Sequence, residues 1–296
     1  MQVLAIFGPT AVGKTGVAVA VAEALRERGE DPVAVSCDAI QVYRGLEVLS
    51  GAADPGQRRR LEHRLLGIEE IGEQFSAGRF AELAHREIDS LLAEGRRPIV
   101  VGGTGLYLRA ALSELELRPP VPEGVRSEVE REMGALGPRA LHGQLEPKAA
   151  AAIHPNDRKR IARTLELQRA GIDPAPTHEQ GGELWTARLR KPALLVGLLV
   201  DRAELDARIE ARVEAMLGAG ARAEVEAADA AGASRTARAA IGFEELLGGD
   251  VEAMKAAQRG YARRQLTWLR RMEDIATIDR SGRSDEDVAA EIISLL

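Results

Sequence analysis

Residues 8–15 read Gly-Pro-Thr-Ala-Val-Gly-Lys-Thr, directly after the apolar run Val3-Leu4-Ala5-Ile6-Phe7 and at the start of a helical pattern. This is the Gly-x-x-x-x-Gly-Lys-Thr pattern of a phosphate-binding loop, in the strand-to-helix context that such a loop requires. Its glycines let the backbone curl so that N–H groups point at phosphate oxygens, and the helix N-terminus adds partial positive charge. We therefore expect a diphosphate or nucleotide to be bound by Gly8, Pro9, Thr10, Ala11, Val12, Gly13, Lys14 and Thr15.

Two side chains of this loop have separate tasks. Lys14 supplies a full positive charge for the terminal phosphates, and the Thr15 hydroxyl is the candidate ligand for Mg²⁺, the cofactor that we expect. Many kinases and other ATP-binding proteins share the motif. It therefore indicates phosphate binding and leaves the reaction open.

The sequence around the loop predicts a parallel sheet with helices on both faces. Apolar, strand-like runs alternate with helical patterns over the first hundred residues. The expected strands are 2–7, 32–37 and 98–101, and the expected helices are 14–28 and 79–94. Because strand–helix alternation produces parallel strands joined by crossover helices, we expect an α/β fold of the P-loop NTPase or kinase type.

The alternation stops near residue 113 and returns near residue 190. Residues 123–171 carry only helical patterns, and residues 171–182 are rich in turn-forming residues. Further on, the chain predicts strands at 193–200 and 275–278 and helices at about 202–217, 221–231, 250–271 and from 285. We therefore expect a core domain at 1–112 and 191–296 that is interrupted by an all-helical insertion domain at 113–190.

Composition and charge restrict the classes of protein to which the chain can belong. The chain has 296 residues, a formal net charge of −6, 45% hydrophobic residues and a single cysteine, Cys37. One cysteine excludes an internal disulfide and a cysteine-based zinc site. No apolar run approaches the ~20 residues that span a bilayer, and the apolar start is typical of a first strand, not of a signal peptide. We expect a cytoplasmic monomer with no membrane partner.

Two basic clusters interrupt this acidic composition. His154–Arg163 holds four basic residues, not counting the histidine, against one acid, and Met254–Met272 holds six basic residues and no acid before Glu273. Such clusters are typical either of solvated helix faces or of surfaces that bind a polyanion. For Arg263–Arg271, which is interleaved with Leu266 and Trp268, we favour a helix packed on the core with its arginines in solvent.

Asp38 ends the second expected strand, at the sheet edge where open α/β folds bind ligands. The residue is suited to hold Mg²⁺ through water or to accept a proton from a nucleophile, and it also fits an ordinary loop or capping aspartate. Its neighbour Cys37 has no evident histidine partner, so we interpret it as a small buried residue and not as a nucleophile.

Five further segments, together with the phosphate loop, resemble the tRNA dimethylallyltransferase family in the same order along nearly the whole chain. They are Ser36-Cys37-Asp38-Ala39-Ile40-Gln41-Val42-Tyr43-Arg44-Gly45, Gly102-Gly103-Thr104-Gly105-Leu106-Tyr107-Leu108-Arg109, residues 153–163, residues 240–244 and residues 261–268. Members of that family transfer a dimethylallyl group from dimethylallyl diphosphate to N6 of an adenosine next to the anticodon, in tRNAs that read codons beginning with U. The resemblance also implies that a helical insertion helps to hold the anticodon stem-loop.

For the chemistry, the resemblance implies three catalytic candidates: Asp38, Thr104 and Arg109. Asp38 acts as general base on N6, while Lys14, Thr15 and Mg²⁺ stabilise the charge of the leaving diphosphate. Thr104 contacts the nucleotide or the diphosphate, or it caps its helix, and Arg109 adds a second cation or lies on the helix surface. The adenine must leave its stack to reach such a site.

The resemblance also implies a set of tRNA contacts. The expected tRNA-binding residues are Asp38, Ala39, Ile40, Gln41, Thr104, Arg126, Lys159, Arg160, Ile161, Ala162 and Arg163. Lysine and arginine contacts with phosphates set the affinity and make it salt-dependent. The amide of Gln41 is suited to read the edge of a base.

The chain departs from the family pattern in three places. Ala39 stands where the family has a serine, residues 51–55 read Gly-Ala-Ala-Asp-Pro in place of Gly-Thr-Ala-Lys-Pro, and residues 63–65 read His-Arg-Leu in place of His-His-Leu. The effect of these changes on activity stays open, whereas the phosphate loop and Asp38 are intact. No C-terminal zinc finger follows, which is typical of the bacterial form.

Three other functions stay open. A small-molecule kinase would use the same loop on ATP, although no arginine-rich lid is evident. An adenine-nucleotide isopentenyltransferase would use a smaller acceptor, against which the helical insertion and the basic residues 158–163 argue. A non-catalytic RNA-binding protein would have kept the fold alone. The sequence does not determine which tRNAs are modified or whether the prenyl group is altered later.

Overall fold

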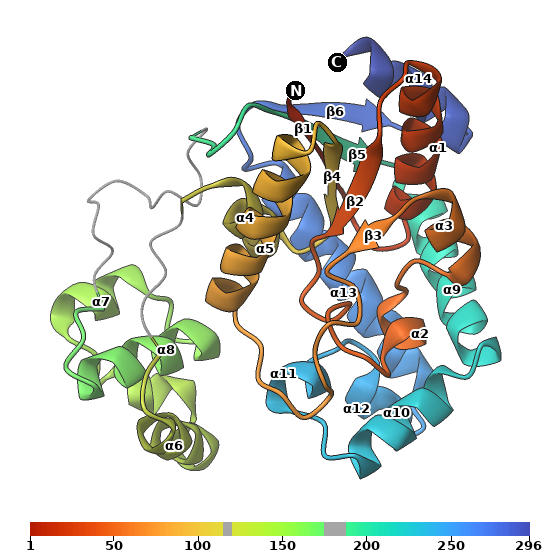
Figure 1. The fold of residues 1–296 in the computed structure, drawn as a ribbon. Helices are drawn as coiled ribbons and strands as arrows, with labels where there is room; N and C mark the ends of the chain where they lie inside the picture. Colours follow the sequence, from red (N-terminus) through yellow and green to blue (C-terminus); the bar gives the residue numbers. More distant parts are fainter. Residues whose placement is uncertain (115–119, 175–187) are drawn as a thin grey trace. The chain divides into compact units, whose positions relative to one another are not determined.

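The computed structural model of the chain describes residues 1–114, 120–174 and 188–296, so most of the expected turn-rich stretch 171–182 lies outside the described residues. The chain divides into two compact units (Figure 1). Unit 1 consists of Met1–Leu115 and Glu183–Leu296, and unit 2 is Glu116–Gly182. Unit 1 is therefore assembled from two parts of the chain that are far apart in sequence.

Within the described residues, unit 1 contains a six-stranded parallel sheet with the strand order β3-β2-β4-β1-β5-β6. The strands are β1 (Val3–Phe7), β2 (Pro32–Ser36), β3 (His63–Arg64), β4 (Arg97–Gly102), β5 (Ala193–Leu199) and β6 (Ile275–Asp279). The helices are α1 (Lys14–Glu27), α2 (Glu47–Ser50), α3 (Pro55–Arg60), α4 (Ala77–Ala93), α5 (Gly105–Leu112), α9 (Arg202–Gly218), α10 (Ala221–Ala230), α11 (Arg235–Arg238), α12 (Phe243–Leu247), α13 (Val251–Leu269) and α14 (Asp285–Ser294).

Side chains of the central strand β1 alternate between two hydrophobic cores. Val3 and Ala5 belong to the core that includes α4 and α5, whereas Leu4 and Ile6 belong to the core that includes α1 and α14. Because successive side chains of a strand point to opposite faces, helices cover both faces of the sheet. Figure 1 shows α1 beside α14 and α4 beside α5. The predicted α/β fold is confirmed.

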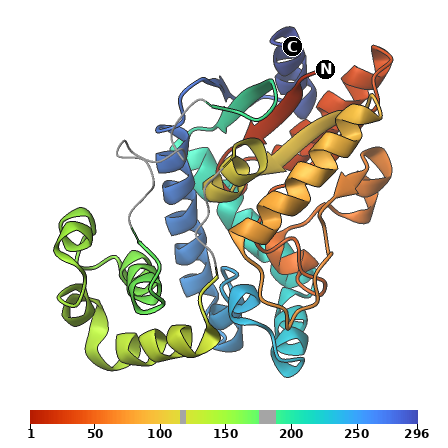
Figure 2. The same cartoon turned by 60° about the vertical axis from the view of Figure 1, so that its left-hand side comes forward.

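Helix α13 brings residues from the C-terminal part of the chain to the centre of unit 1. It packs against α9 and α5 (Figure 2). One of its faces is buried and includes Met254, Ala262 and Leu269, whereas Arg263 and Arg270 are exposed. The predicted helix, packed on the core with arginines in solvent, is confirmed.

Unit 2 consists, in its described residues, of the helices α6 (Glu123–His142), α7 (Pro147–Ala152) and α8 (Arg158–Arg169). Its own core is formed by Val129, Met133, Leu141, Leu145, Ile161 and Leu165. Helix α6 is kinked at Gly137, which has a φ of 78° and precedes Pro138. Helix α8 begins after Asp157, whose side chain accepts the N–H of Arg160. Across the described parts of both units, no helix is long and apolar enough to cross a membrane.

Three short elements between β2 and α4 are not predicted from the sequence: α2, α3 and β3. Each has six residues or fewer, which is too short for a periodic pattern to be recognised. Asp54 begins α3 with a capping box, because its side chain accepts the N–H of Gln57 at 2.9 Å and Gln57 accepts the N–H of Asp54 at 3.0 Å. The aspartate that departs from the family pattern thus caps a helix.

Candidate diphosphate-binding and catalytic site

The phosphate loop joins β1 to α1 at the carboxyl edge of the sheet. Gly13 is the N-cap residue of α1 and has a φ of 88°, while Ala11 has a φ of 62°, which is uncommon for a residue with a Cβ. Left-handed residues in a tight turn direct neighbouring N–H groups into one concavity. The loop therefore has the backbone geometry of an anion cradle, as the sequence predicts.

Lys14 is folded back into this loop. Its Nζ donates to the carbonyl oxygens of Gly8 at 3.0 Å and Pro9 at 2.9 Å. Burial, and then the charge of Arg212, lowers the pKa of Lys14 to about 7, while the charge of Asp38 acts in the opposite direction. The loop therefore holds a cation that lacks sufficient negative charge nearby, which an incoming diphosphate would supply.

Asp38 follows β2 and turns back on its own backbone. Its Oδ1 accepts the N–H groups of Ile40 at 2.9 Å and Gln41 at 3.4 Å, whereas Oδ2 accepts no hydrogen bond from the described residues. Burial raises the pKa of Asp38, although the two N–H groups, Lys14 and Arg212 act against this rise. A carboxylate with a raised pKa and an oxygen without a partner is suited to accept a proton.

Arg212 of α9 is a site residue that the sequence analysis missed. Its Nη2 donates to the carbonyl oxygen of Ser50 at 3.2 Å. Burial lowers the pKa of Arg212, and the charge of Asp38 opposes this. No local signal marks the residue, because Arg212 belongs to an ordinary helical run of alternating charge. The fold alone brings this second cation to Lys14 and Asp38.

Gln265 of α13 joins the phosphate loop to the second glycine turn. Its Oε1 accepts the N–H of Thr10 at 2.7 Å, and its Nε2 donates to the carbonyl oxygen of Gly103 at 2.8 Å. A Cβ on Gly103 would lie 2.1 Å from that Nε2 and 3.2 Å from Nζ of Lys14. The two turns can therefore approach each other because Gly103 has no side chain.

Thr104 occupies the N-cap position of α5, but its hydroxyl does not cap the helix. Instead, its Oγ1 lies 3.0 Å from the hydroxyl oxygen of Tyr261. Burial, and then the charge of Asp38, raises the pKa of Tyr261. Tyr261 is therefore a further site residue. It and Gln265 lie in the 261–268 segment that carries the family resemblance, which was the signal available to sequence analysis.

Two other candidates are buried. Arg109 is only 3% exposed, so its interpretation as a surface residue is wrong. Burial lowers the pKa of Arg109, and the opposing charge is that of Glu273. Its catalytic role stays a prediction. Cys37 is fully buried as predicted, and burial raises the pKa of its thiol, which disfavours the nucleophilic thiolate.

Gln41 uses both ends of its amide within the chain. Its Oε1 accepts the hydroxyl of Ser36 at 2.8 Å, and its Nε2 donates to the carbonyl oxygen of Gly51 at 3.3 Å. Reading a base would require Gln41 to give up or share one of these bonds. Its neighbours Ala39 and Ile40 are partly buried against the core that includes α4 and α5.

In unit 2, two of the predicted tRNA-binding arginines converge on the buried carboxylate of Glu166. Nε of Arg126 lies 3.9 Å from Oε1 of Glu166, and Nη1 of Arg163 lies 3.2 Å from Oε2. Glu166 is a partner that the sequence analysis missed. Nη1 of Arg126 also lies 3.8 Å from Oε2 of Glu123, so Glu166 is one of two carboxylates beside Arg126.

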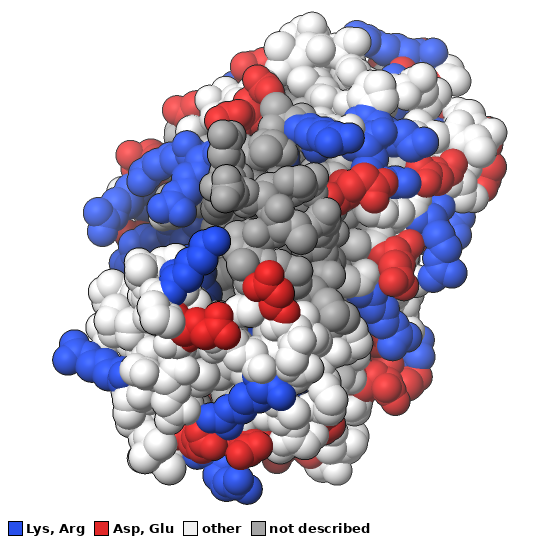
Figure 3. All heavy atoms as spheres, turned by 90° about the vertical axis from the view of Figure 1, so that its left-hand side faces the viewer, with Lys and Arg blue, Asp and Glu red and all other residues white. Residues whose placement is uncertain are grey.

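The other predicted residues of α8 differ in exposure. Nε of Arg160 lies 3.4 Å from a carboxylate oxygen of Asp157, whereas Lys159 forms no ion pair with a described residue. The side chain of Ile161 is fully buried and that of Ala162 is partly buried, so both serve the core of unit 2. On the face drawn in Figure 3, basic side chains lie among acidic ones. Binding of RNA phosphates to this face would therefore rest on individual lysine and arginine side chains.

The described residues contain no group of three or more His, Cys, Asp or Glu side chains that could hold a metal ion. Mg²⁺ bound with a diphosphate needs fewer protein ligands, since it keeps several waters and also takes phosphate oxygens. The Thr15 hydroxyl lies in the first turn of α1 and forms no hydrogen bond with a described residue. This donor set fits Mg²⁺ that is bound together with a diphosphate.

The fold and the site define a phosphate-loop α/β protein in which a carboxylate and a second cation lie beside the loop lysine. The chain matches the family model described as IPP transferase over residues 41–272. It is 37% identical over 312 residues to the tRNA dimethylallyltransferase of Kineococcus radiotolerans, with 100% of this chain and 96% of the relative covered. The chain belongs to the IPP transferase family.

The alignment with the Kineococcus relative spans the whole chain, so it includes residues 8–15, which lie outside the range matched by the family model, and other relatives agree. The tRNA dimethylallyltransferase of Anaeromyxobacter sp. (strain Fw109-5) is 40% identical over 290 residues, with 94% of each chain covered. The crystal structure of the tRNA isopentenylpyrophosphate transferase from Bacillus halodurans is similar with a TM-score of 0.70 and 31% identity, over 99% of this chain and 95% of that chain. A eukaryotic dimethylallyltransferase acting on tRNA shares the fold, with a TM-score of 0.75 at 23% identity over 99% of this chain and 77% of that chain.

Proposed function

We propose that this chain transfers a dimethylallyl group from dimethylallyl diphosphate to N6 of the adenosine on the 3′ side of the anticodon, in tRNAs that read codons beginning with U. The supporting observation is the placement of Asp38 beside Lys14 and Arg212 at the phosphate loop, close enough for their charges to affect one another's pKa. A loop of this kind also suits a kinase. The names of the relatives favour prenyl transfer.

The leaving group is the first part of the mechanism. The bond between the dimethylallyl carbon and the bridging oxygen breaks, and its electron pair remains on the diphosphate. The loop N–H groups, Lys14 and Arg212 stabilise the negative charge that develops there. Mg²⁺, held by Thr15 and the phosphate oxygens, would add positive charge at the same group when bound.

The nucleophile is the second part. The exocyclic amine N6 is weakly basic because its lone pair is delocalised into the ring, so it must lose a proton as the carbon–nitrogen bond forms. Oδ2 of Asp38 accepts that proton, a contribution of typically about 10²–10⁴-fold to the rate. The paired hydroxyls of Thr104 and Tyr261 are suited to orient the base or the diphosphate.

The acceptor requires a surface for RNA. We assign residues 113–190 to a helical insertion domain that contacts the anticodon stem-loop and the rest of the chain to the phosphate-loop core. Lys159 and Arg160 on α8 are suited to bind backbone phosphates, and Arg126 and Arg163 lie next to the carboxylate of Glu166. We also propose that the protein acts as a monomer with Mg²⁺, which light scattering and metal titration would test.

Mass spectrometry of anticodon-loop nucleosides tests the proposal. The protein is incubated with Mg²⁺, tRNA and either dimethylallyl diphosphate or ATP. We expect one adenosine beside the anticodon to gain one dimethylallyl group, with release of diphosphate. Consumption of ATP without prenyl transfer would identify a kinase, and equal activity on AMP and tRNA would identify an adenine-nucleotide enzyme. Either result would overturn the proposal.

A further inference from the structure

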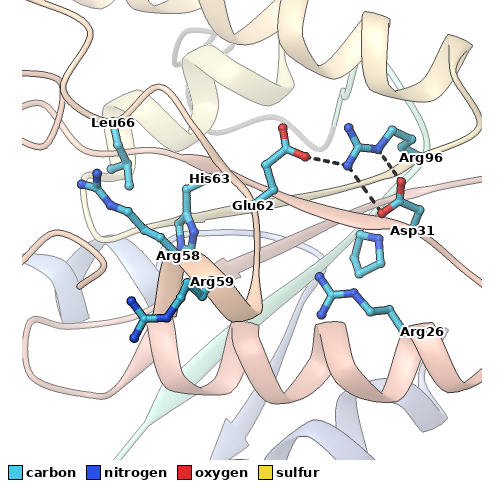
Figure 4. Close-up of a pocket in the computed structure, with 9 residues that line it drawn as sticks. Arg26, Asp31, Arg58, Arg59, Glu62, His63, Leu66 and Arg96 are labelled. Atoms are coloured by element: carbon cyan, nitrogen blue, oxygen red, sulfur yellow. Dashed lines mark hydrogen bonds and ion pairs between the residues drawn. The ribbon is translucent and has the colours of Figure 1, made fainter. Parts of the chain in front are cut away.

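A cavity of about 480 Å³ lies on unit 1 among side chains that have no part in the proposed reaction (Figure 4). It is lined by Arg26, Asp31, Pro32, Arg58, Arg59, Glu62, His63, Leu66 and Arg96. These residues come from the end of α1, from α3, from the starts of β2 and β3, and from the segments beside them. None of the residues proposed for catalysis lines this cavity.

Both carboxylates of the lining are already paired. Nε of Arg96 lies 2.6 Å from an oxygen of Asp31, and its Nη2 lies 2.7 Å from an oxygen of Glu62. The other oxygen of Glu62 lies 2.7 Å from Arg64. Figure 4 shows this network on one side of the cavity. The acidic side chains of the lining are therefore occupied by arginines other than Arg26, Arg58 and Arg59.

Those three arginines form no ion pair within residues 1–114, 120–174 and 188–296. Two of them are anchored by backbone oxygens, because Nη1 of Arg26 donates to Arg60 at 2.6 Å and Nε of Arg58 donates to Ala53 at 2.9 Å. Arg60 differs, since Glu23 binds its side chain at 2.8 Å. Three cations without an acidic partner among the described residues thus line part of the cavity, and two of them are held by backbone oxygens.

His63 lines the same cavity as these arginines, and Figure 4 shows it beside Arg58 and Arg59, with Arg26 on the side of the cavity where Asp31 lies. Its Nδ1 lies 2.7 Å from the carbonyl oxygen of Leu61, so this nitrogen carries a hydrogen and Nε2 is left for another partner. The ring is partly buried. Burial lowers the pKa of His63, and the charge of Arg58 acts in the same direction. The negative charge of an anion in the cavity would favour the imidazolium and so oppose this lowering.

The arginines also have a role that needs no ligand. Arg26 lies in the last turn of α1, and Arg58 and Arg59 lie in the last turn of α3, where positive charge complements the helix dipole. That role does not require the side chains to line one cavity together with a histidine. Their shared place in this lining, without an ion-pair partner among the described residues, is the observation that favours a ligand.

We propose that this cavity binds a phosphoryl group. The planar forks of guanidinium groups match the oxygens of a phosphate, and a protonated His63 in the same lining would add a further donor. The volume lies within the roughly 300–1,000 Å³ of small-ligand sites. The phosphoryl group belongs either to a free phosphate compound or to an RNA backbone. The inference does not depend on the proposed function.

Nuclear magnetic resonance of the histidine side chains tests the proposal, with inorganic diphosphate as the probe. We expect the His63 ring signals to shift and the pKa of His63 to rise as diphosphate is added. Joint replacement Arg58→Gln and Arg59→Gln weakens the apparent affinity at His63 by at least about tenfold. Arg28→Gln is the matched control, because it removes the same charge just beyond α1 and outside the cavity.

Two further measurements distinguish this site from the phosphate loop and identify the source of the phosphoryl group. In Lys14→Ala the response of His63 to diphosphate persists. If an anticodon stem-loop RNA displaces diphosphate at His63, the natural phosphate is that of RNA, and if it does not, the natural ligand is a free phosphate compound. A double variant that fails to fold, judged by circular dichroism, is replaced by Arg26→Gln.

The proposal is overturned by any of three results. His63 does not respond to diphosphate or RNA, its response disappears in Lys14→Ala, or the arginine variants respond as strongly as Arg28→Gln. None of these results bears on prenyl transfer, so failure here is distinguishable from failure of the proposed function.

Discussion

Gln265 and Thr10 lie 255 positions apart in the sequence and are joined by a hydrogen bond of 2.7 Å. The Gln265 side chain accepts the backbone N–H of Thr10 and donates to the carbonyl oxygen of Gly103. Both bonds are buried, so one amide holds the phosphate loop against the second glycine turn. Gln265 is therefore a positioning residue for the diphosphate cradle.

Replacing Gln265 tests this role. Gln265→Leu leaves the N–H of Thr10 and the carbonyl of Gly103 buried without these partners, and each such group costs about 1–3 kcal/mol. Gln265→Glu keeps an acceptor for Thr10 and loses the donor to Gly103, so its free energy of unfolding should be intermediate. Urea denaturation measures both. Equal stability of Gln265→Leu and the parent chain would contradict the assignment.

Asp38→Asn should reduce the rate of prenyl transfer by about 10²–10⁴-fold. The general base must be ionised, and burial raises the pKa of Asp38. The rate of the parent chain should therefore rise with pH as Asp38 loses its proton, whereas the residual rate of the variant should lack this rise. Single-turnover rates across the acid range measure the difference. A parallel pH profile in Asp38→Asn would exclude Asp38 as the base.

Binding of a diphosphate should take up a proton above pH 7. The pKa of Lys14 in the free protein is about 7, and a bound anion raises it because it favours the ammonium form. Affinity should be highest below pH 7 and fall by at most about tenfold per pH unit above it.

Calorimetry at pH 8, in two buffers with different ionisation enthalpies, counts the protons. In Lys14→Arg the side chain keeps its charge, so any remaining uptake belongs to the ligand itself. Equal proton uptake by this variant and the parent chain would show that Lys14 is already charged in the free protein.

Gly13→Ala should be more damaging than Gly29→Ala, although both glycines have a positive φ, of 88° and 80°. A Cβ at Gly13 would lie 2.0 Å from Nη1 of Arg280, which donates to the carbonyl oxygen of Val12 at 2.6 Å, whereas a Cβ at Gly29 meets nothing within 4 Å. Gly29→Ala measures the backbone cost alone, about 1–2 kcal/mol. We expect a larger loss of unfolding free energy in Gly13→Ala, together with loss of diphosphate binding. Similar values would show that Arg280 moves aside easily.

Lys159→Gln should weaken tRNA binding and make it less dependent on salt. Lys159 forms no ion pair with a described residue, so its charge is available for a phosphate. Each lost phosphate contact lowers the slope of log affinity against log salt by about 0.7–0.9. Lys148→Gln on α7 removes the same charge in the same unit and serves as the control. Identical slopes in the two variants would remove Lys159 from the interface.

Much of the fold and part of the site could be predicted from the sequence, because they depend on local patterns. The phosphate loop is recognised by Gly8, Gly13, Lys14 and Thr15 at set spacings after an apolar run. Asp38 is recognised because a residue that ends a parallel strand lies at the ligand-binding edge. The short elements α2, α3 and β3 were missed because a few residues carry no periodicity.

Other site residues could not be predicted, because nothing near them in sequence marks their partners. Arg212 lies in an ordinary helical pattern, the segment of Gln265 is marked by the family resemblance but its contact with Thr10 is not, and the buried carboxylate of Glu166 follows exposed charges on α8. For Arg109 the sequence left open a second cation at the site or a surface position, and its burial excludes the surface position. Burial and partner choice depend on which helix faces meet, and this is a property of the packed chain.

The sequence by itself determined the phosphate-binding loop, the parallel sheet around it and the aspartate at the sheet edge, because backbone curvature and strand or helix periodicity are encoded within a few residues. Only the tertiary structure decided that the loop is held by Gln265 and Arg280, that Arg212 joins Lys14 and Asp38, and that the hydroxyl of Thr104 meets Tyr261. These contacts join residues more than 150 positions apart, and the physical reason is that hydrogen bonds and charges act across space once helices have packed.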